Sequence, residues 1–219
     1  KNKDTKMLLT PGPTPVPEFV RKAMSDITIH HRTEEFEAIF KNTRELLIEL
    51  YDMPEVVMLA SSGTGAMEAC VTNLTHKKAL TINSGKFGER FGKICAAFGI
   101  DYTEIKNEWD TPVSVEEVLN TVKNDSNIDA IFIQVCESAG GLRHPVEEIA
   151  KEIKKINSDI MIVADGITAL GVEKIDTTNI DAVVTGSQKA LMLPPGLAMI
   201  GFSNAAVAKI ESKPRGYYF

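Results

Sequence analysis

Strand-like and helix-like runs alternate along most of the chain, and this order restricts the fold more than any other feature. Short apolar runs rich in β-branched residues are followed by amphipathic stretches of helical period. The predicted strands are residues 56–60, 79–83, 129–135, 160–164 and 181–185. The predicted helices are residues 34–50, 64–74, 89–98, 114–123 and 146–156. Such alternation predicts right-handed crossovers and an α/β fold of three layers, α/β/α, around a mostly parallel sheet.

The two ends of the chain differ from this alternating pattern. A last apolar run, residues 197–202, follows the fifth strand after a short proline-containing connection. That connection is too short for a helical crossover, so we expect this strand to be antiparallel. Residues 1–20 carry prolines 11, 13, 15 and 17 around Gly12, which predicts an extended N-terminal arm. We therefore expect an arm over residues 1–20 and one sheet domain over residues 21–219.

Composition restricts the class of protein. The 219 residues are 43% hydrophobic and 25% charged, which is ordinary for a globular domain. A net charge of −6 argues against a general affinity for nucleic acid or for an anionic membrane. No apolar run approaches the roughly 20 residues of a membrane span, and no signal-peptide core is present. Cys70, Cys95 and Cys136 form neither a disulfide set nor a CxxC pair, so we interpret them as buried thiols of a cytoplasmic protein.

Four clusters of small and polar residues follow predicted strands. They are Ser61-Ser-Gly-Thr-Gly65, Cys136-Glu-Ser-Ala-Gly-Gly141, Asp165-Gly-Ile-Thr168 and Gly186-Ser-Gln-Lys189. The carboxyl ends of parallel strands share one edge of a sheet, where α/β proteins bind their ligands. We therefore expect the four clusters to form one site.

Lys189 and Asp165 are the candidate catalytic residues. Lys189 lies between an apolar strand and an apolar, proline-rich stretch, so its ammonium group is expected to be occluded. Burial lowers the pKa of a lysine and leaves a neutral amine, which can form a Schiff base with an aldehyde or ketone. Asp165 ends a buried strand next to the lysine strand. An amine that carries an aldehyde and an acid that keeps a ring nitrogen protonated together indicate pyridoxal 5′-phosphate.

Two further features have both a functional and a purely structural interpretation. The cluster with Ser62, Gly63 and Thr64 opens a helix, so it can bind a phosphate at the helix N-terminus or can simply cap the helix. It matches neither the GxGxxG nor the Walker pattern. Phe87 lies at a strand end, where it can stack on a planar cofactor or belong to the core.

Metal binding and triad hydrolysis are poorly supported. His30 and His31 are adjacent, and adjacent residues do not face one ligand, so we expect no metal site. Neither Ser62 nor Ser187 lies in a GxSxG turn, and His144 precedes a proline.

Together these residues give a sequence that resembles the class V, fold type I pyridoxal-phosphate aminotransferases, most closely the alanine–glyoxylate and serine–pyruvate branch. The resemblance covers nearly the whole chain, and its ordered set of motifs is specific although no single piece is. The motifs are Leu8-Leu-Thr-Pro-Gly-Pro-Thr14, His31-Arg-Thr-Glu-Glu-Phe36, Ser62-Gly-Thr-Gly65, Asn83-Ser-Gly-Lys-Phe-Gly-Glu-Arg90, Glu137-Ser-Ala-Gly-Gly141, Asp165 to Gly171, Gly186-Ser-Gln-Lys-Ala190 and Pro194-Pro-Gly196.

The resemblance implies a role for each motif residue. Lys189 corresponds to the Schiff-base lysine and Asp165 to the partner of the pyridine nitrogen. Phe87 and Ile167 correspond to residues on the two faces of the ring. The remaining implied contacts are Ser62, Gly63, Thr64 and Gln188 at the phosphate, Ser138 near the 3′-oxygen and Gly12 at the substrate. A homodimer with cofactors near its interface is also implied.

The sequence departs from the family pattern in three places. Ala139 and Gly140 stand where further hydroxyls are common, and Gly166 stands where serine is common. The pocket is therefore expected to be less polar than usual. The family continues into a smaller C-terminal domain with an arginine that binds the substrate carboxylate, and we expect this chain to be the large domain without it.

The activity that the resemblance implies is transamination between alanine or serine and glyoxylate or pyruvate. An aminoethylphosphonate aminotransferase or a cysteine desulfurase could share the same lysine and aspartate. Desulfurases need a mobile, exposed cysteine, and none of the three cysteines is expected to be so placed. A third alternative is a non-catalytic dimerisation module that retains the fold.

Overall fold

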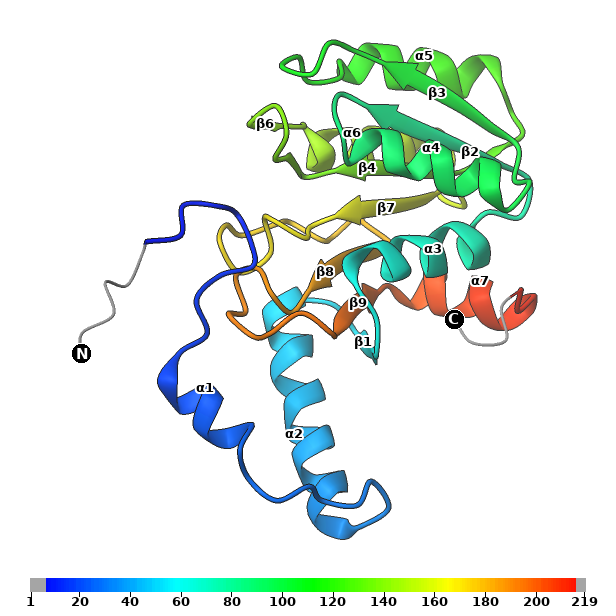
Figure 1. Ribbon diagram of the computed structural model, residues 1–219. Coiled ribbons are helices and arrows are strands. Elements are labelled where there is room, and N and C mark those ends of the chain that lie inside the picture. The colour runs from blue at the N-terminus through cyan, green and yellow to red at the C-terminus, as the bar shows by residue number, and fades with distance from the viewer. Residues whose placement is uncertain (1–6, 216–219) are drawn as a thin grey trace.

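A seven-stranded sheet forms the centre of the computed structural model, which describes residues 7–215 (Figure 1). The strand order is β1-β9-β8-β7-β4-β2-β3. The strands are β1 (Glu55–Leu59), β2 (Lys78–Asn83), β3 (Tyr102–Lys106), β4 (Ile128–Gln134), β7 (Met161–Asp165), β8 (Ala182–Gly186) and β9 (Ala198–Phe202). A separate small ribbon pairs β5 (Cys136–Glu137) with β6 (Leu142–Arg143).

Only β9 opposes the common strand direction among these seven strands. It pairs antiparallel with both β8 and β1, whereas the pairs from β8 to β3 are all parallel. The mostly parallel sheet and its antiparallel last strand are therefore confirmed. Parallel direction brings the carboxyl ends of β2, β4, β7 and β8 to one edge, where Gln134 is the register partner of Asp165.

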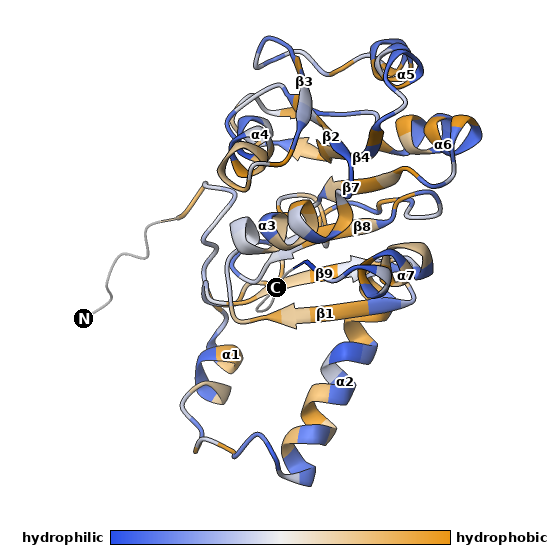
Figure 2. Ribbon diagram, turned by 90° about the vertical axis from the view of Figure 1, so that its right-hand side faces the viewer, coloured by the Kyte–Doolittle hydropathy of each residue, from blue (hydrophilic) through white to orange (hydrophobic). Residues whose placement is uncertain are grey.

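Helices cover both faces of the sheet. They are α1 (Glu18–Ala23), α2 (Glu34–Tyr51), α3 (Gly63–Leu74), α4 (Gly88–Ala97), α5 (Val115–Asn124), α6 (Val146–Ile156) and α7 (Asn204–Ser212). Buried residues of α5, α6 and the end of α2 pack on one face, and those of α3, α4 and α7 pack on the other. Figure 2 shows α4 and α6 on opposite sides of the strands. The three-layer prediction is thus confirmed.

Five elements were not expected from the sequence: strand β3, the two-residue strands β5 and β6, and helices α1 and α7. Strand β3 carries Glu104 and Lys106 and lies at the sheet edge, so it lacks the apolar run of a central strand. Helices α1 and α7 are short and have few buried residues, so their apolar pattern is weak. An apolar pattern this weak does not identify a helix or strand from sequence alone.

Residues 7–17 of the N-terminal arm form neither helix nor strand, and the chain bends at residues 10–13. Helix α1 begins at Glu18, so the last three residues of the expected arm are helical. Pro17, with a φ of −58°, suits the entry to a helix, and the Glu18 carboxylate complements the helix dipole. Residues 1–6 of the expected arm lie outside the described residues.

The arm packs against the loop that carries Lys189. The Thr14 backbone N–H donates to the Gln188 carbonyl at 3.0 Å, and the Thr14 hydroxyl donates to the Lys189 carbonyl at 3.0 Å. A Cβ on Gly12 would lie 2.5 Å from Cδ of Lys189, so a larger residue at position 12 would require the lysine side chain to move. The arm therefore forms part of the wall around the lysine.

Candidate active site

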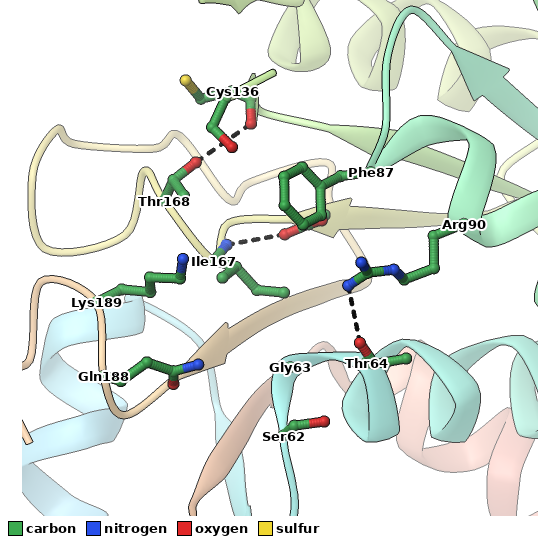
Figure 3. Close-up of a pocket in the computed structure, with 12 residues that line it drawn as sticks. Ser62, Gly63, Thr64, Phe87, Arg90, Cys136, Ile167, Thr168, Gln188 and Lys189 are labelled. Carbon is green, nitrogen blue, oxygen red and sulfur yellow. Dashed lines mark hydrogen bonds between the residues drawn. The ribbon is translucent and has the colours of Figure 1, made fainter. Parts of the chain in front are cut away.

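A pocket of about 110 Å³ opens at the carboxyl edge of the sheet (Figure 3). Its walls come from the turn before α3, the start of α4, the segment after β4 and the loops after β7 and β8. The lining residues are Ser62, Gly63, Thr64, Phe87, Arg90, Cys136, Ser138, Asp165, Ile167, Thr168, Gln188 and Lys189. Nine of the sequence-predicted site residues line this one pocket, and Gly12 packs behind Lys189.

Lys189 lies half-buried in the loop after β8. Ser187 shapes this loop, because its hydroxyl donates to the Pro194 carbonyl at 2.6 Å and accepts from the Leu197 N–H at 3.3 Å. Burial lowers the pKa of Lys189, and the positive charge of Arg90 lowers it further, while Asp165 opposes the shift. The lowered pKa increases the fraction of neutral, nucleophilic amine at a given pH.

Asp165 ends strand β7 and is 4% exposed. Its Oδ1 accepts a hydrogen bond from the Ile167 N–H at 2.9 Å. Burial raises the pKa of Asp165 to about 6, the nearby Glu137 also raises it, and Arg90 and Lys189 oppose the shift. Burial of a charged carboxylate costs free energy. A cationic or N–H group of a ligand bound beside Asp165 would offset that cost.

Asp165→Asn should stabilise the cofactor-free protein at neutral pH. Because the pKa of Asp165 is raised from 3.8 to about 6, its contribution to stability is fully present below pH 3.8 and is lost as the pH rises through 6. An asparagine keeps the bond from Ile167 without this loss. We expect the free energy of unfolding at pH 7.5 to increase by on the order of 2–3 kcal/mol, with no increase at pH 3.5. Urea denaturation at both pH values measures this, and an equal change at both would contradict the assignment.

The start of α3 forms the lower wall of the pocket in Figure 3. Ser62 caps the helix, with its hydroxyl accepting from the Gly65 N–H at 3.4 Å, so the capping interpretation is correct. The same turn lines the pocket, and the first N–H groups of a helix have no acceptor within the helix. A Cβ on Gly63 would lie 2.4 Å from Cδ1 of Ile167, so glycine lets that side chain pack closely on the helix start. The turn can therefore cap α3 and face an anionic group at once.

Phe87 and Arg90 project from the start of α4 into the pocket. The guanidinium carbon of Arg90 lies 4.8 Å from the centre of the Phe87 ring, and its Nη1 donates to the Thr64 hydroxyl at 2.9 Å. Arg90 was present in a quoted motif, but no role was expected for it. Phe87 lies before the predicted helix 89–98 and is the N-cap residue of α4, so no helical spacing in the sequence linked Arg90 to it.

Cys136 and Thr168 also line the pocket without having been predicted to do so. Cys136 is half-buried, whereas Cys70 and Cys95 are buried, so the interpretation of all three as buried thiols is wrong for Cys136. The Thr168 hydroxyl donates to the Cys136 carbonyl at 3.2 Å. Cys136 begins the short strand β5, which follows the end of β4 at Gln134 after one intervening residue.

His30 and His31 lie away from the pocket lining, with their ring centroids 4.6 Å apart. Within residues 7–215, no group of three or more His, Cys, Asp or Glu side chains is arranged to hold a metal ion. No helix in that range has both the length and the apolar character needed to cross a bilayer.

The fold and the pocket define a pyridoxal-phosphate-dependent protein of fold type I. The donors suit that cofactor: an amine of lowered pKa, a buried carboxylate, an aromatic side chain and a helix start surround one cavity. The chain belongs to the aminotransferase class-V family, whose model matches residues 7–216.

Relatives and solved structures agree with this assignment. An uncharacterized aminotransferase of Helicobacter pylori is 50% identical over 213 residues, covering 97% of this chain and 58% of the relative. A serine–glyoxylate aminotransferase of Hyphomicrobium methylovorum is 31% identical and covers 95% of this chain and 54% of the relative. The crystal structure of a subgroup IV aspartate aminotransferase from Thermus thermophilus is 32% identical, with a TM-score of 0.89, over 97% of this chain and 61% of that chain. The chain thus spans little more than half the length of these curated relatives.

Proposed function

We propose that the protein transfers an amino group between a small amino acid, alanine or serine, and a 2-oxo acid, glyoxylate or pyruvate. The observation that carries this proposal is that Lys189 and Asp165 face one pocket at the sheet edge, each with its pKa shifted by burial. Family membership and the relative named for serine and glyoxylate support the reaction class. Another relative, from Paracoccus denitrificans, is named for L-aspartate and glyoxylate, so aspartate belongs among the donors to be tested.

In this proposal Lys189 has two tasks. Its amine would hold the cofactor covalently and, once released, would take the proton from the α-carbon of the amino acid and donate it again later in the reaction. Both tasks need the neutral amine, which the lowered pKa of Lys189 favours. The bound cofactor supplies an electron sink for the charge that remains when this proton leaves.

Asp165 holds the proton on the ring nitrogen and thereby keeps the ring cationic. The remaining lining residues orient the cofactor in this proposal. Phe87 and Ile167 would pack on the ring, Ser138 would contact its 3′-oxygen, and Gly12 would leave room for the substrate beside Lys189. The phosphate would be held by Ser62, Gly63, Thr64 and Gln188.

A homodimer is a further part of the proposal. Helix α2 extends away from the sheet with α1 beside it (Figure 1), and α2 exposes 51% of Ile39, 45% of Phe40 and 59% of Leu46. Apolar side chains gathered along one helix favour association with a second subunit. Sedimentation equilibrium at the natural length of the protein tests this, and a monomer at micromolar concentration would contradict it. The cytoplasmic location stays a prediction for cell fractionation.

Borohydride reduction is the decisive experiment for the cofactor linkage. The protein should be yellow with bound pyridoxal phosphate, and reduction followed by peptide mass mapping should place the adduct on Lys189. An adduct on another lysine would refute the assignment to Lys189. No adduct at saturating cofactor would also refute it and would favour the non-catalytic dimerisation module.

Turnover assays then identify the reaction. Alanine, serine and aspartate should be tested as donors with glyoxylate and pyruvate as acceptors, and 2-aminoethylphosphonate should be included as an alternative donor. Cysteine with sulfide detection tests the desulfurase alternative, which the position of Cys136 at the pocket makes worth measuring. Sulfide release faster than transamination of every donor would overturn the proposed reaction.

A further inference from the structure

Glu137 is a fully buried carboxylate next to the pocket, and none of the roles described above uses it. It lies in the short strand β5, one residue before Ser138, and is 0% exposed. Its Oε2 accepts hydrogen bonds from the N–H groups of Phe87 and Gly88, both at 2.9 Å. Its Oε1 accepts from the Ala139 N–H at 3.0 Å.

The hydrogen bonds that Glu137 accepts take the place of a side-chain cap at the N-terminus of α4. Phe87 occupies the N-cap position of α4, and its own side chain makes no capping bond. The acceptor comes instead from a residue fifty positions later in the chain. A carboxylate at a helix start also interacts favourably with the helix dipole. Glu137 therefore fixes the backbone from which the Phe87 ring projects.

The local sequence leaves room for this contact. A Cβ on Gly85 would lie 2.4 Å from Cγ and 2.5 Å from Cδ of Glu137, so any side chain at position 85 would displace the carboxylate. Glycine at position 85 and glutamate at position 137 thus form one structural unit. Phe87 connects this unit to the pocket wall. Arg90 packs on the Phe87 ring and donates a hydrogen bond to Thr64.

We propose that Glu137 is a positioning residue for the cofactor: it holds the start of α4 so that Phe87 presents its ring to the pocket. This inference rests on the proposed function, because it takes Phe87 to stack on pyridoxal phosphate. Its measurable consequence is a change in cofactor affinity that acts through Phe87, beyond any general loss of stability.

The test measures the dissociation constant for pyridoxal phosphate by equilibrium dialysis, on the protein at its natural length. Glu137→Ala removes both acceptor oxygens, and with them all three hydrogen bonds, and should raise the constant about tenfold or more. Glu137→Gln should recover most of the affinity, because the amide oxygen can still accept from both Phe87 and Gly88. If the glutamine variant binds as weakly as the alanine variant, the bonds to Phe87 and Gly88 are not the cause, and the proposal fails.

A double-mutant cycle with Phe87→Leu separates positioning from direct contact. If Glu137 acts through the aromatic ring, Glu137→Ala should change the constant less than about twofold once Phe87 is leucine. An equal loss in both backgrounds would overturn the proposal. Should Glu137→Ala not fold, Gly85→Ala replaces it in the cycle, because it displaces the carboxylate without removing it.

Asp129 supplies the matched control. Its carboxylate also accepts three backbone N–H bonds, from His76, Lys77 and Lys78, but it lies near the start of β4, at the opposite end of that strand from the pocket. Asp129→Ala should destabilise the protein and leave the dissociation constant within about twofold of wild type. A tenfold weaker constant in this control would mean that loss of a carboxylate that accepts backbone hydrogen bonds weakens binding wherever it lies, which would refute the specific role of Glu137. Wild type that forms no adduct at Lys189 would refute the proposed function instead, so the two failures are distinguishable.

Discussion

Lys189→Ala should reduce transamination by about 10⁴-fold or more and abolish the borohydride-reducible adduct, because the variant loses both the covalent anchor and the proton-transferring amine. Turnover with alanine and glyoxylate, together with peptide mapping after reduction, measures both effects. Lys189→Arg should be similarly inactive, since a guanidinium stays protonated and cannot form the linkage.

Lys93 provides the control for this substitution. It lies on the exposed side of α4, where its ammonium pairs with Glu89 at 2.8 Å, and 63% of its side chain is exposed. Lys93→Ala should therefore leave both turnover and the adduct unchanged. Activity of Lys189→Ala within tenfold of wild type would show that another group performs the proton transfer.

Asp165→Asn should slow removal of the α-proton by about 10²- to 10³-fold while cofactor still binds, because an amide cannot stabilise positive charge on the ring nitrogen. Single-turnover measurements with α-deuterated and ordinary substrate isolate this step, and the isotope effect should increase as proton removal becomes limiting. Near-normal single-turnover rates would refute the role of Asp165.

Stability measurements on the same variant exclude a trivial explanation. The cofactor-free Asp165→Asn variant is expected to be more stable than cofactor-free wild type at neutral pH, so a loss of folding would not account for its reduced activity. If replacing Asp165 raises the free energy of unfolding but lowers activity, its burial is needed for function and reduces the stability of the protein.

The sequence was sufficient for the central architecture because each of its elements has a strong local pattern. The run at β7 is continuously apolar and ends at Asp165, and the connection before β9 is too short for a crossover, so the parallel strands and the antiparallel strand could both be predicted. Parallel strands then bring Asp165 and the loop of Lys189 to one edge by geometry alone. No similar pattern marks the edge strand β3, which is half exposed and charged.

The rest of the site depends on contacts between distant parts of the chain. Glu137 binds the start of α4 across fifty residues, and Thr14 binds the Lys189 carbonyl across 175. Arg90 has the ordinary sequence context of a solvent-facing helical arginine, yet it contacts Thr64 within the pocket. Such pairings leave no periodic trace in the sequence, so they become visible only when the packed structure is known.

The position of β9 has a consequence for synthesis of the protein. Strand β9 lies between β8 and β1. Strand β1 therefore has no described partner in the sheet until β9 has been synthesised. The loop of Lys189 is anchored at one end by β8 and at the other by β9. Pairings so distant in sequence form slowly. The loop of Lys189 is therefore held at both ends only after β9 has been synthesised and has paired with β8, so cofactor capture follows formation of that pair.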